Sequence, residues 1–386
     1  SEGWLRNMNL RPKNRKPTKN GRQHGLRLGA WPRSYPGAWL RSDMIAGVTT
    51  AAVVIPKAMA YATIAGLPVA VGLYTAFIPM VIYAILGTSR PLSVSTTSTI
   101  AILTASEISR LAPGGDPAQL VAAATTLAFL VGVFLLLSGV FRLGFVANFI
   151  SDPVLTGFKA GIGLVIVVDQ VPILLWIHFS IGCFFHNVLS IALHVPDTGV
   201  ATLILALITL IVLAGLEHFR PRLPAPLFAV VLGIAASGLL GLEQIGVELA
   251  GRIATGLPAP VLPDFSMIRN LWPGALGIAL MSFIESIAAG RAFTRQGDPR
   301  PASNRELIAL GAANLVGGFF RILPSGGGTS QTAVNDKAGA RTQAAELVTA
   351  GLVLAVLLFL SPLISLMPQA TLAAVVVATT AGLLNP

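Results

Sequence analysis

Charged residues are scarce in this chain. Only 11% of its 386 residues are Asp, Glu, Lys or Arg, whereas 54% are hydrophobic. Soluble domains carry about 25% charged residues. The deficit excludes an ordinary soluble domain and indicates that most helices face lipid or each other. The composition therefore predicts an all-α polytopic membrane protein.

Residues and motifs typical of enzymes and metal sites are also few. Cys183 is the only cysteine, which excludes an intrachain disulfide and a thiolate metal cluster. The Gly-x-Ser-x-Gly motif of hydrolases is absent. The run 326–328 is three glycines, but the Gly-Lys-Ser/Thr of a phosphate-binding loop does not follow it. The sequence thus predicts no enzymatic activity, no cofactor and no metal.

Positive charge is distributed unevenly. Residues 1–42 contain ten Lys or Arg and one acid, whereas the rest of the chain is almost neutral. A basic tail is found in nucleic-acid-binding proteins, but it is also typical of cytoplasmic segments of membrane proteins. We favour the second interpretation, a cytoplasmic tail near anionic lipid, and predict no nucleic-acid partner.

Twelve apolar spans follow this tail. Two of them, 96–108 and 329–338, are too short to cross a bilayer as helices, which takes about 20 residues. The twelve spans are 44–66, 69–86, 96–108, 118–140, 153–175, 198–216, 225–242, 273–291, 305–321, 329–338, 343–361 and 368–384.

The charges between these spans predict an orientation. With the N-terminus inside and strict alternation, eleven Lys or Arg lie at inside ends and loops, against four outside. This asymmetry predicts a multi-pass protein of the cell (inner) membrane with a cytoplasmic N-terminus. The two short spans then enter the membrane from opposite sides.

Both short spans are preceded by similar, helix-breaking segments. Residues 91–99 and 324–332 each contain a proline, small or flexible residues and then a Ser/Thr-rich stretch. Paired interruptions in two halves of a membrane protein are the best sequence indication of a transporter's substrate site. If each segment is extended to mid-membrane and helical afterwards, two helix N-termini face each other. Their free N–H groups would form an anion site.

One ionisable residue lies deep in the first helix of each putative half. Lys57 precedes Pro91 by 34 residues, and Glu285 precedes Pro324 by 39. Charges inside a membrane are costly and usually face a cavity or a partner. Two interpretations remain open, a buried Lys57–Glu285 ion pair that only holds the halves together, and a role in a transport cycle.

Several ordered motifs resemble those of the SulP family of sulfate permeases, whose animal relatives include prestin, and the resemblance covers about 42–386. They are Ser42-Asp43-Met44-Ile45-Ala46-Gly47, Ile55-Pro56-Lys57-Ala58-Met59-Ala60-Tyr61-Ala62, Ala65-Gly66-Leu67-Pro68, Gly72-Leu73-Tyr74, Leu86-Gly87-Thr88-Ser89-Arg90, Pro153-Val154-Leu155-Thr156-Gly157-Phe158, Glu306-Leu307-Ile308-Ala309, Ala313-Asn314, Thr332-Ala333-Val334-Asn335 and Gly339-Ala340-Arg341-Thr342-Gln343.

The resemblance implies a fold of fourteen membrane segments in two intertwined inverted repeats of seven, with the two half-helices meeting near the midplane. It divides the chain into a basic tail (1–42), core segments 1–4 (43–150), gate segments 5–7 (151–272), core segments 8–11 (273–361) and the start of segment 12 (362–386). Family members usually dimerise and carry a C-terminal STAS domain. About twelve of the fourteen segments are present, so we expect a chain truncated before segments 13–14 and the STAS domain.

The function that the resemblance implies is secondary transport of a small anion, such as sulfate, another oxyanion or a dicarboxylate, by alternating access. The substrate would lie between the helices 97–108 and 329–338, with a proton or sodium as coupling ion. The substrate-binding residues would be Lys57, Tyr61, Phe77, Thr97, Ser98, Thr329, Ser330 and Gln331, and the coupling residue would be Glu285.

Two positions depart from the family pattern. Many relatives have Gln or Glu at the position of Lys57, and many anion exchangers have Arg at the position of Gln331. We therefore hypothesise that Lys57 supplies the positive charge of the anion site. The alternative is that Lys57 neutralises Glu285 and removes a coupling step.

Other functions remain open at this stage: an anion channel or voltage-driven motor, a chloride/bicarbonate exchanger, or a non-transporting remnant. Two further features have structural interpretations. The turn with Arg291, Arg295, Arg300, Arg305 and Asp298 is a topology determinant or a docking surface for a STAS domain. The glycines Gly157, Gly161 and Gly163 predict close helix packing.

Overall fold

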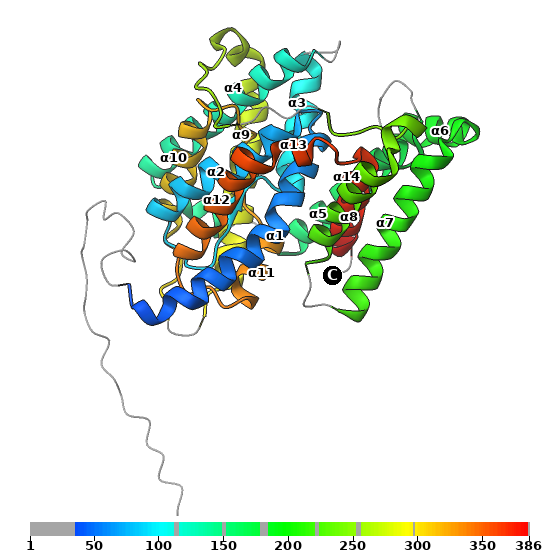
Figure 1. The fold of residues 1–386 in the computed structure, drawn as a ribbon. Helices are drawn as coiled ribbons and strands as arrows, with labels where there is room; N and C mark the ends of the chain where they lie inside the picture. The colour runs from blue at the N-terminus through cyan, green and yellow to red at the C-terminus, as the bar shows by residue number, and fades with distance from the viewer. Residues whose placement is uncertain are drawn as a thin grey trace, which may run out of the picture.

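The structure, a computed structural model, describes residues 35–111, 116–148, 152–177, 184–220, 224–251, 256–295 and 298–384. Helices dominate these residues (Figure 1). The α-helices are α1 (Leu40–Ile64), α2 (Val69–Leu86), α3 (Ser98–Leu111), α4 (Pro117–Val140), α5 (Asp152–Leu175), α6 (Phe184–His194), α7 (Val200–Phe219), α8 (Ala225–Leu240), α9 (Ile268–Ala292), α10 (Ser303–Gly317), α11 (Thr329–Lys337), α12 (Ala344–Ala355), α13 (Ser361–Ile364) and α14 (Gln369–Leu384).

Short elements complete the fold. Two strands, β1 (Val94–Ser95) and β2 (Gly326–Gly327), form a two-stranded antiparallel sheet. The 3-10 helices are η2 (Gly37–Trp39), η3 (Leu143–Asn148), η4 (Val195–Asp197), η5 (Leu242–Ile245) and η6 (Phe265–Met267), and η7 (Val356–Leu360) is a π-helical turn.

Local sequence signals explain several helix ends. The side chain of Asp116 accepts a hydrogen bond from the backbone N–H of Ala118 at 3.3 Å and caps α4, whose first residue is Pro117. The turn between α1 and α2 contains Gly66 at a φ of +68°, a conformation that strongly favours glycine, and Pro68 directly before α2. The glycine and the proline in this turn therefore separate the two apolar runs into two helices.

Membrane-compatible helices are the main architectural feature. Within the described ranges, six segments have the length and hydropathy needed to cross a bilayer: Gly37–Ile64, Val69–Leu86, Pro117–Val140, Val200–Phe219, Phe265–Ala292 and Ala344–Ile364. The structure adds the helix α6 within the predicted loop between 175 and 198. It also shortens the predicted span 305–321, because α10 ends at Gly317 and is followed by a turn over 318–321 before the chain reaches β2.

The helices pack in two groups (Figure 1). Helices α1 to α4 and α9 to α12 contact one another, and α5, α7, α8 and α14 form the second group, with α6 against α5. Helix α1 contacts α8 and α14, so it lies at the boundary between the groups. The central sheet lies within the first group, because β1 contacts α2 and β2 contacts α9.

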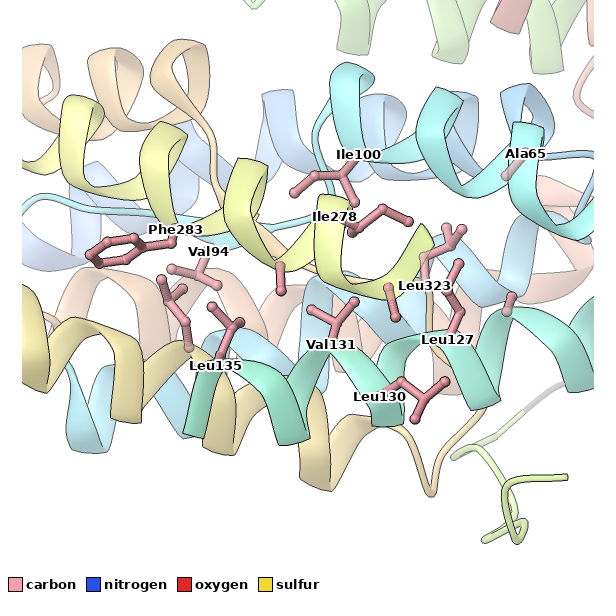
Figure 2. Close-up of a cluster of buried hydrophobic side chains, with 14 of the residues drawn as sticks. Ala65, Val94, Ile100, Leu127, Leu130, Val131, Leu135, Ile278, Phe283 and Leu323 are labelled. Atoms are coloured by element: carbon pink, nitrogen blue, oxygen red, sulfur yellow. The ribbon is translucent and has the colours of Figure 1, made fainter. Parts of the chain in front are cut away.

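A hydrophobic core holds the sheet in place. Val94 of β1 packs with Ile100 of α3, Phe283 and Ile278 of α9, and Leu135 of α4 in one buried cluster (Figure 2). Burying each of these side chains contributes roughly 1.5–3 kcal/mol relative to exposure to water. The sheet is therefore held within the closely packed first group of helices.

Close backbone approach occurs between α4 and α10. A Cβ added to Gly311 would lie 2.7 Å from the backbone nitrogen of Leu136, and one added to Gly132 would clash with the backbone of Leu315. The packing predicted for the glycines of 157–163 is wrong for Gly157 and Gly161, since an added Cβ there would meet no described atom within 4 Å. The small residues that allow α4 and α10 to pack this closely thus include Gly132 and Gly311.

Candidate functional site

The two interrupted segments meet at the centre of the first group. Val94 pairs with Gly327 and Ser95 with Gly326 in the antiparallel sheet. The backbone N–H of Gly328 also donates to the carbonyl of Ser93 at 3.1 Å. Because the strands are antiparallel, the helices that follow them, α3 and α11, continue from opposite ends of the short sheet and leave it in opposite directions. The facing arrangement of two half-helices expected from the sequence is therefore present.

A small cavity of about 50 Å³ lies at these two helix N-termini. Its volume suits an ion of a few atoms. It is lined by Tyr61, Thr96, Thr97, Ser98, Thr99, Glu285, Gly328, Thr329, Ser330 and Gln331. Seven of these residues, namely Tyr61, Thr97, Ser98, Glu285, Thr329, Ser330 and Gln331, are among the nine singled out from the sequence.

The eighth predicted residue, Lys57, adjoins the cavity through Ser330. Its Nζ donates a hydrogen bond to Ser330 Oγ at 3.0 Å, and its side chain is only 7% exposed. An ammonium group buried to this extent requires a partner or a nearby anion. Lys57 thus places a positive charge one hydroxyl away from the cavity.

Glu285 lies on α9 and contacts the start of α3. Its Oε1 accepts from Thr99 Oγ1 at 2.8 Å, and its Oε2 accepts from Thr97 Oγ1 at 2.9 Å. Each oxygen of the buried carboxylate therefore has a hydroxyl donor. These bonds connect α9 to the start of α3. Protonation of Glu285 would therefore alter the hydrogen bonds of two threonines that line the cavity.

Gln331, on α11, is held by two hydrogen bonds to β1 and the residue before it. Its Nε2 donates to the carbonyl of Ser93 at 3.1 Å, and its Oε1 accepts from Ser95 Oγ at 2.9 Å. A longer, charged side chain at this position would lose this bidentate contact with β1. Gln331 therefore lines the cavity and also links α11 to β1.

The ninth residue, Phe77, lies elsewhere. It packs against the hydrophobic cluster that contains Val54, Met80 and Leu213 and is not one of the residues that line the cavity. An aromatic side chain on the apolar helix α2 gains more from packing with aliphatic neighbours than from a polar cavity. The sequence pattern did not distinguish these two environments.

The site presents donors from several sources. The first turns of α3 and α11 offer backbone N–H groups without intrahelical partners and the positive ends of two helix dipoles. The hydroxyls of Ser98, Thr329 and Ser330 add donors of adjustable direction. Together with the nearby ammonium of Lys57, these groups favour a small anion.

Residues outside the prediction support the cavity. Asn335 Nδ2 donates to the carbonyl of Pro91 and to Glu346 Oε1, both at 3.0 Å. Asn314 Oδ1 accepts from Ser325 N at 2.7 Å and fixes the chain before β2. Both asparagines belong to motifs noted in the sequence, but their role became apparent only from the contacts.

Two further motif pairs meet in space. Glu306 Oε2 accepts from Tyr83 at 2.6 Å, and its Oε1 accepts from the backbone N–H groups of Thr88 and Ser89 at 2.8 and 3.2 Å. Asp43 accepts from the N–H groups of residues 341 and 342. Segments more than two hundred residues apart are thus joined by buried carboxylates. Each carboxylate needs hydrogen-bond donors, and these donors come from the other half of the chain.

Residues 40–386, nearly the whole described chain, match the sulfate permease family. The chain belongs to this family. It is 40% identical over 347 residues to a probable sulfate transporter of Mycobacterium tuberculosis, an alignment that covers 89% of this chain and 62% of that protein. The chain spans less than two thirds of the length of the curated relatives reported for this family.

Solved structures of anion transporters share the fold. The murine solute carrier 26 family member A9, described as an anion transporter in the inward-facing state, superposes with a TM-score of 0.86 at 26% identity, covering 92% of this chain and 62% of that one. The transmembrane domain of a cyanobacterial bicarbonate transporter, BicA, gives a TM-score of 0.82 at 26% identity, covering 90% of this chain and 88% of that one. The inverted-repeat membrane fold expected from the sequence is therefore confirmed, and the family to which the chain belongs is one of transporters, not of enzymes.

Proposed function

We propose that this chain forms the transmembrane path of a secondary transporter for a small anion, such as sulfate, another oxyanion or a dicarboxylate. The observation that carries the proposal is the β1–β2 pair, which brings the N-termini of α3 and α11 to one cavity. The names of the relatives, which include sulfate and bicarbonate transporters, support the same class of substrate.

The anion would bind between the two helix N-termini. Thr97, Ser98, Thr329, Ser330 and Gln331 would surround it, with Tyr61 closing one side. Ser330 is the residue that connects the anion to Lys57, because its hydroxyl oxygen already accepts from Nζ and its hydrogen can point into the cavity. The positive charge of Lys57 is thereby relayed to the anion through one hydroxyl.

Glu285 would couple anion binding to a second ion. While its carboxylate accepts the hydroxyl hydrogens of Thr97 and Thr99, those hydrogens are unavailable to an anion. Protonation of Glu285, or binding of sodium beside it, would release the Thr97 hydroxyl to face the cavity. Proton or sodium coupling in this form makes anion affinity depend on the state of one carboxylate.

Alternating access would arise from movement of one helix group against the other. In this proposal the first group, which contains the cavity, would act as the core, and the second group would act as the gate. Few elements bridge them, chiefly α1 against α8 and α14 and α3 against α5. We propose that the first group moves as an elevator-like body, in a dimer with a cytoplasmic N-terminus.

Uptake of radiolabelled sulfate into liposomes that contain the full chain tests the proposal. Competing bicarbonate, chloride and dicarboxylates identify the anion, and imposed pH or sodium gradients identify the coupling ion. Saturable uptake driven by one of these gradients is the expected result. A steady uncoupled current would instead indicate a channel, and the absence of any anion binding or flux would refute the proposed function.

The variant Lys57→Gln tests the role of the charge. It should weaken anion binding roughly tenfold, since hydrogen bonds to charged groups contribute about 1.5–3 kcal/mol. The matched control is Lys337→Gln, because Lys337 is an exposed lysine at the end of α11, away from the cavity lining. Equal affinity of the Lys57→Gln variant and the wild type would exclude Lys57 from the site.

A further inference from the structure

A second, larger cavity of about 320 Å³ lies at the end of the molecule where α1 begins. Four segments converge on it: the chain before α1, the chain after α2, the stretch from residue 299 into the first turn of α10, and the chain before α12. The lining residues are Tyr35, Pro36, Trp39, Gly87, Thr88, Ser89, Arg90, Pro299, Arg300, Ala302, Arg305, Thr342 and Gln343. None of them belongs to the cavity between α3 and α11.

Three arginines contribute positive charge to the lining of this cavity. It contains Arg90, Arg300 and Arg305, and none of its described lining residues is Asp or Glu. Arg90 Nη1 contacts Asp298 at 2.7 Å and its guanidinium lies 5.9 Å from the centre of the Trp39 ring. The other two arginines add positive charge on the opposite segment. Guanidinium groups bind phosphate oxygens in bidentate fashion, which makes such a cluster suited to a phosphoryl group.

Two buried polar atoms point to a ligand independently of the charge. Ser89 and Gln343 line the cavity and are each 2% exposed, and neither Ser89 Oγ nor Gln343 Oε1 has a hydrogen-bond partner within the described part of the chain. The orientation of Gln343 is fixed, because its Nε2 donates to the carbonyls of residues 89, 90 and 92 at 2.6, 3.2 and 3.0 Å. Buried polar atoms normally have a partner. Here Ser89 Oγ, which lies beside Gly290 of α9, and Gln343 Oε1 are buried atoms of lining residues without such a partner.

We propose that this cavity binds a phosphate ester that also carries hydroxyl groups. The arginines would hold the phosphoryl oxygens, Ser89 would donate to one of them, and Gln343 Oε1 would accept from a ligand hydroxyl. Two sources share this chemistry, the headgroup of a phosphoglycerol lipid and a soluble sugar phosphate or nucleotide.

The size and the walls of the cavity favour a ligand larger than an inorganic anion. Its volume is about six times that of the cavity between α3 and α11. The rings of Tyr35 and Trp39 provide apolar faces for the body of the ligand. Leu40 and Met44, at the start of α1, are 51% and 50% exposed, so an apolar surface suited to acyl chains adjoins these aromatic residues.

A ligand here would act on the chain that enters β1. The cavity includes Ser89 and Arg90, directly before the Pro91 of the first interrupted segment. The three carbonyls that Gln343 holds belong to the same stretch. Occupancy would therefore stabilise the backbone that leads to Val94 and, through the strand pair, the start of α3.

Binding to the full chain in a nonionic detergent tests the proposal. The probes are glycerol 3-phosphate, adenosine monophosphate and dioctanoyl phosphatidylglycerol, with dioctanoyl phosphatidylcholine and glycerol as comparisons, and the affinity is measured by calorimetry and by thermal stabilisation. The double variant Arg300→Gln/Arg305→Gln should weaken binding of the active probe roughly tenfold or more. Both arginines are exposed, so the fold should tolerate the changes. The matched control is Arg291→Gln, at an exposed arginine of the same turn outside the cavity lining.

The results distinguish the two possible sources of the ligand and also test the proposal. Binding of phosphatidylglycerol alone would support the lipid source, and binding of the soluble esters would support a metabolite. The proposal is wrong if no probe binds, or if the double variant binds the active probe as tightly as the wild type does. Transport plays no part in this measurement, so its result stands apart from the proposed function.

Discussion

Replacement of Glu306 by alanine should lower the free energy of unfolding by about 4 kcal/mol. Glu306 is 1% exposed and accepts from Tyr83, which is fully buried, and from the backbone N–H groups of Thr88 and Ser89. Without the carboxylate, at least two buried donors lose their acceptor, and each such loss costs about 1–3 kcal/mol. Since these donors hold the segment between α2 and β1, the loss should also loosen the approach to the central sheet.

The assay is unfolding of the purified chain in mixed micelles with increasing sodium dodecyl sulfate, monitored by circular dichroism. Glu243→Ala is the control, because Glu243 is an exposed carboxylate in η5. Glu306→Gln should be intermediate, as one amide oxygen can accept only part of the set. Tyr83→Phe combined with Glu306→Ala should cost less than the sum of the two single changes. A Glu306→Ala variant within about 0.5 kcal/mol of the wild type would refute this reasoning.

Three further predictions concern other parts of the fold. Gly327→Ala should destabilise the protein by about 1–3 kcal/mol in the same unfolding assay, since its Cβ would lie 3.0 Å from the Cα of Ser286, whereas Gly351→Ala, with no atom within 4 Å, should have no such cost. Gln331→Ala should reduce anion affinity in the liposome assay, because it removes the link between α11 and β1; unchanged affinity would contradict that role. Burial and the nearby Asp43 carboxylate raise the pKa of Tyr35 to about 12, so its stabilising contribution should persist up to the ordinary tyrosine pKa near 10 and be lost as the pH rises through 12. The difference in tyrosinate absorbance between the wild type and Tyr35→Phe measures this, and ionisation near 10 would contradict it.

The sequence predicted the features that rest on local composition. The two short spans and their prolines indicated half-helices, and the structure shows α3 and α11 starting at the predicted places. The cavity lining also followed from the Ser/Thr clusters, because hydroxyl groups within apolar sequence need a polar surrounding.

What the sequence could not predict depends on contacts between distant residues. The partners of Lys57 and Glu285 are hydroxyl groups contributed by the opposite half of the chain, and nothing in the local pattern specifies such pairs. Phe77 was predicted to bind the substrate, whereas it packs against an apolar cluster on α2 and its neighbours. Likewise, the glycines of α5 predicted close helix packing, whereas Gly132 and Gly311, which were not singled out, lie against another backbone.

The strand pair also has a consequence for biogenesis. Ser95 and Gln331, which hydrogen-bond across it, are 236 residues apart. At a synthesis rate of about 5–20 residues per second, β1 would wait roughly 10–50 s before β2 emerges from the ribosome. During that interval the polar backbone of β1 cannot be left exposed to hydrocarbon without a large cost. The first half of the chain must therefore be held at a polar protein surface or a hydrated site until its second half arrives, so assembly of the sheet is an obligatory late step of membrane insertion.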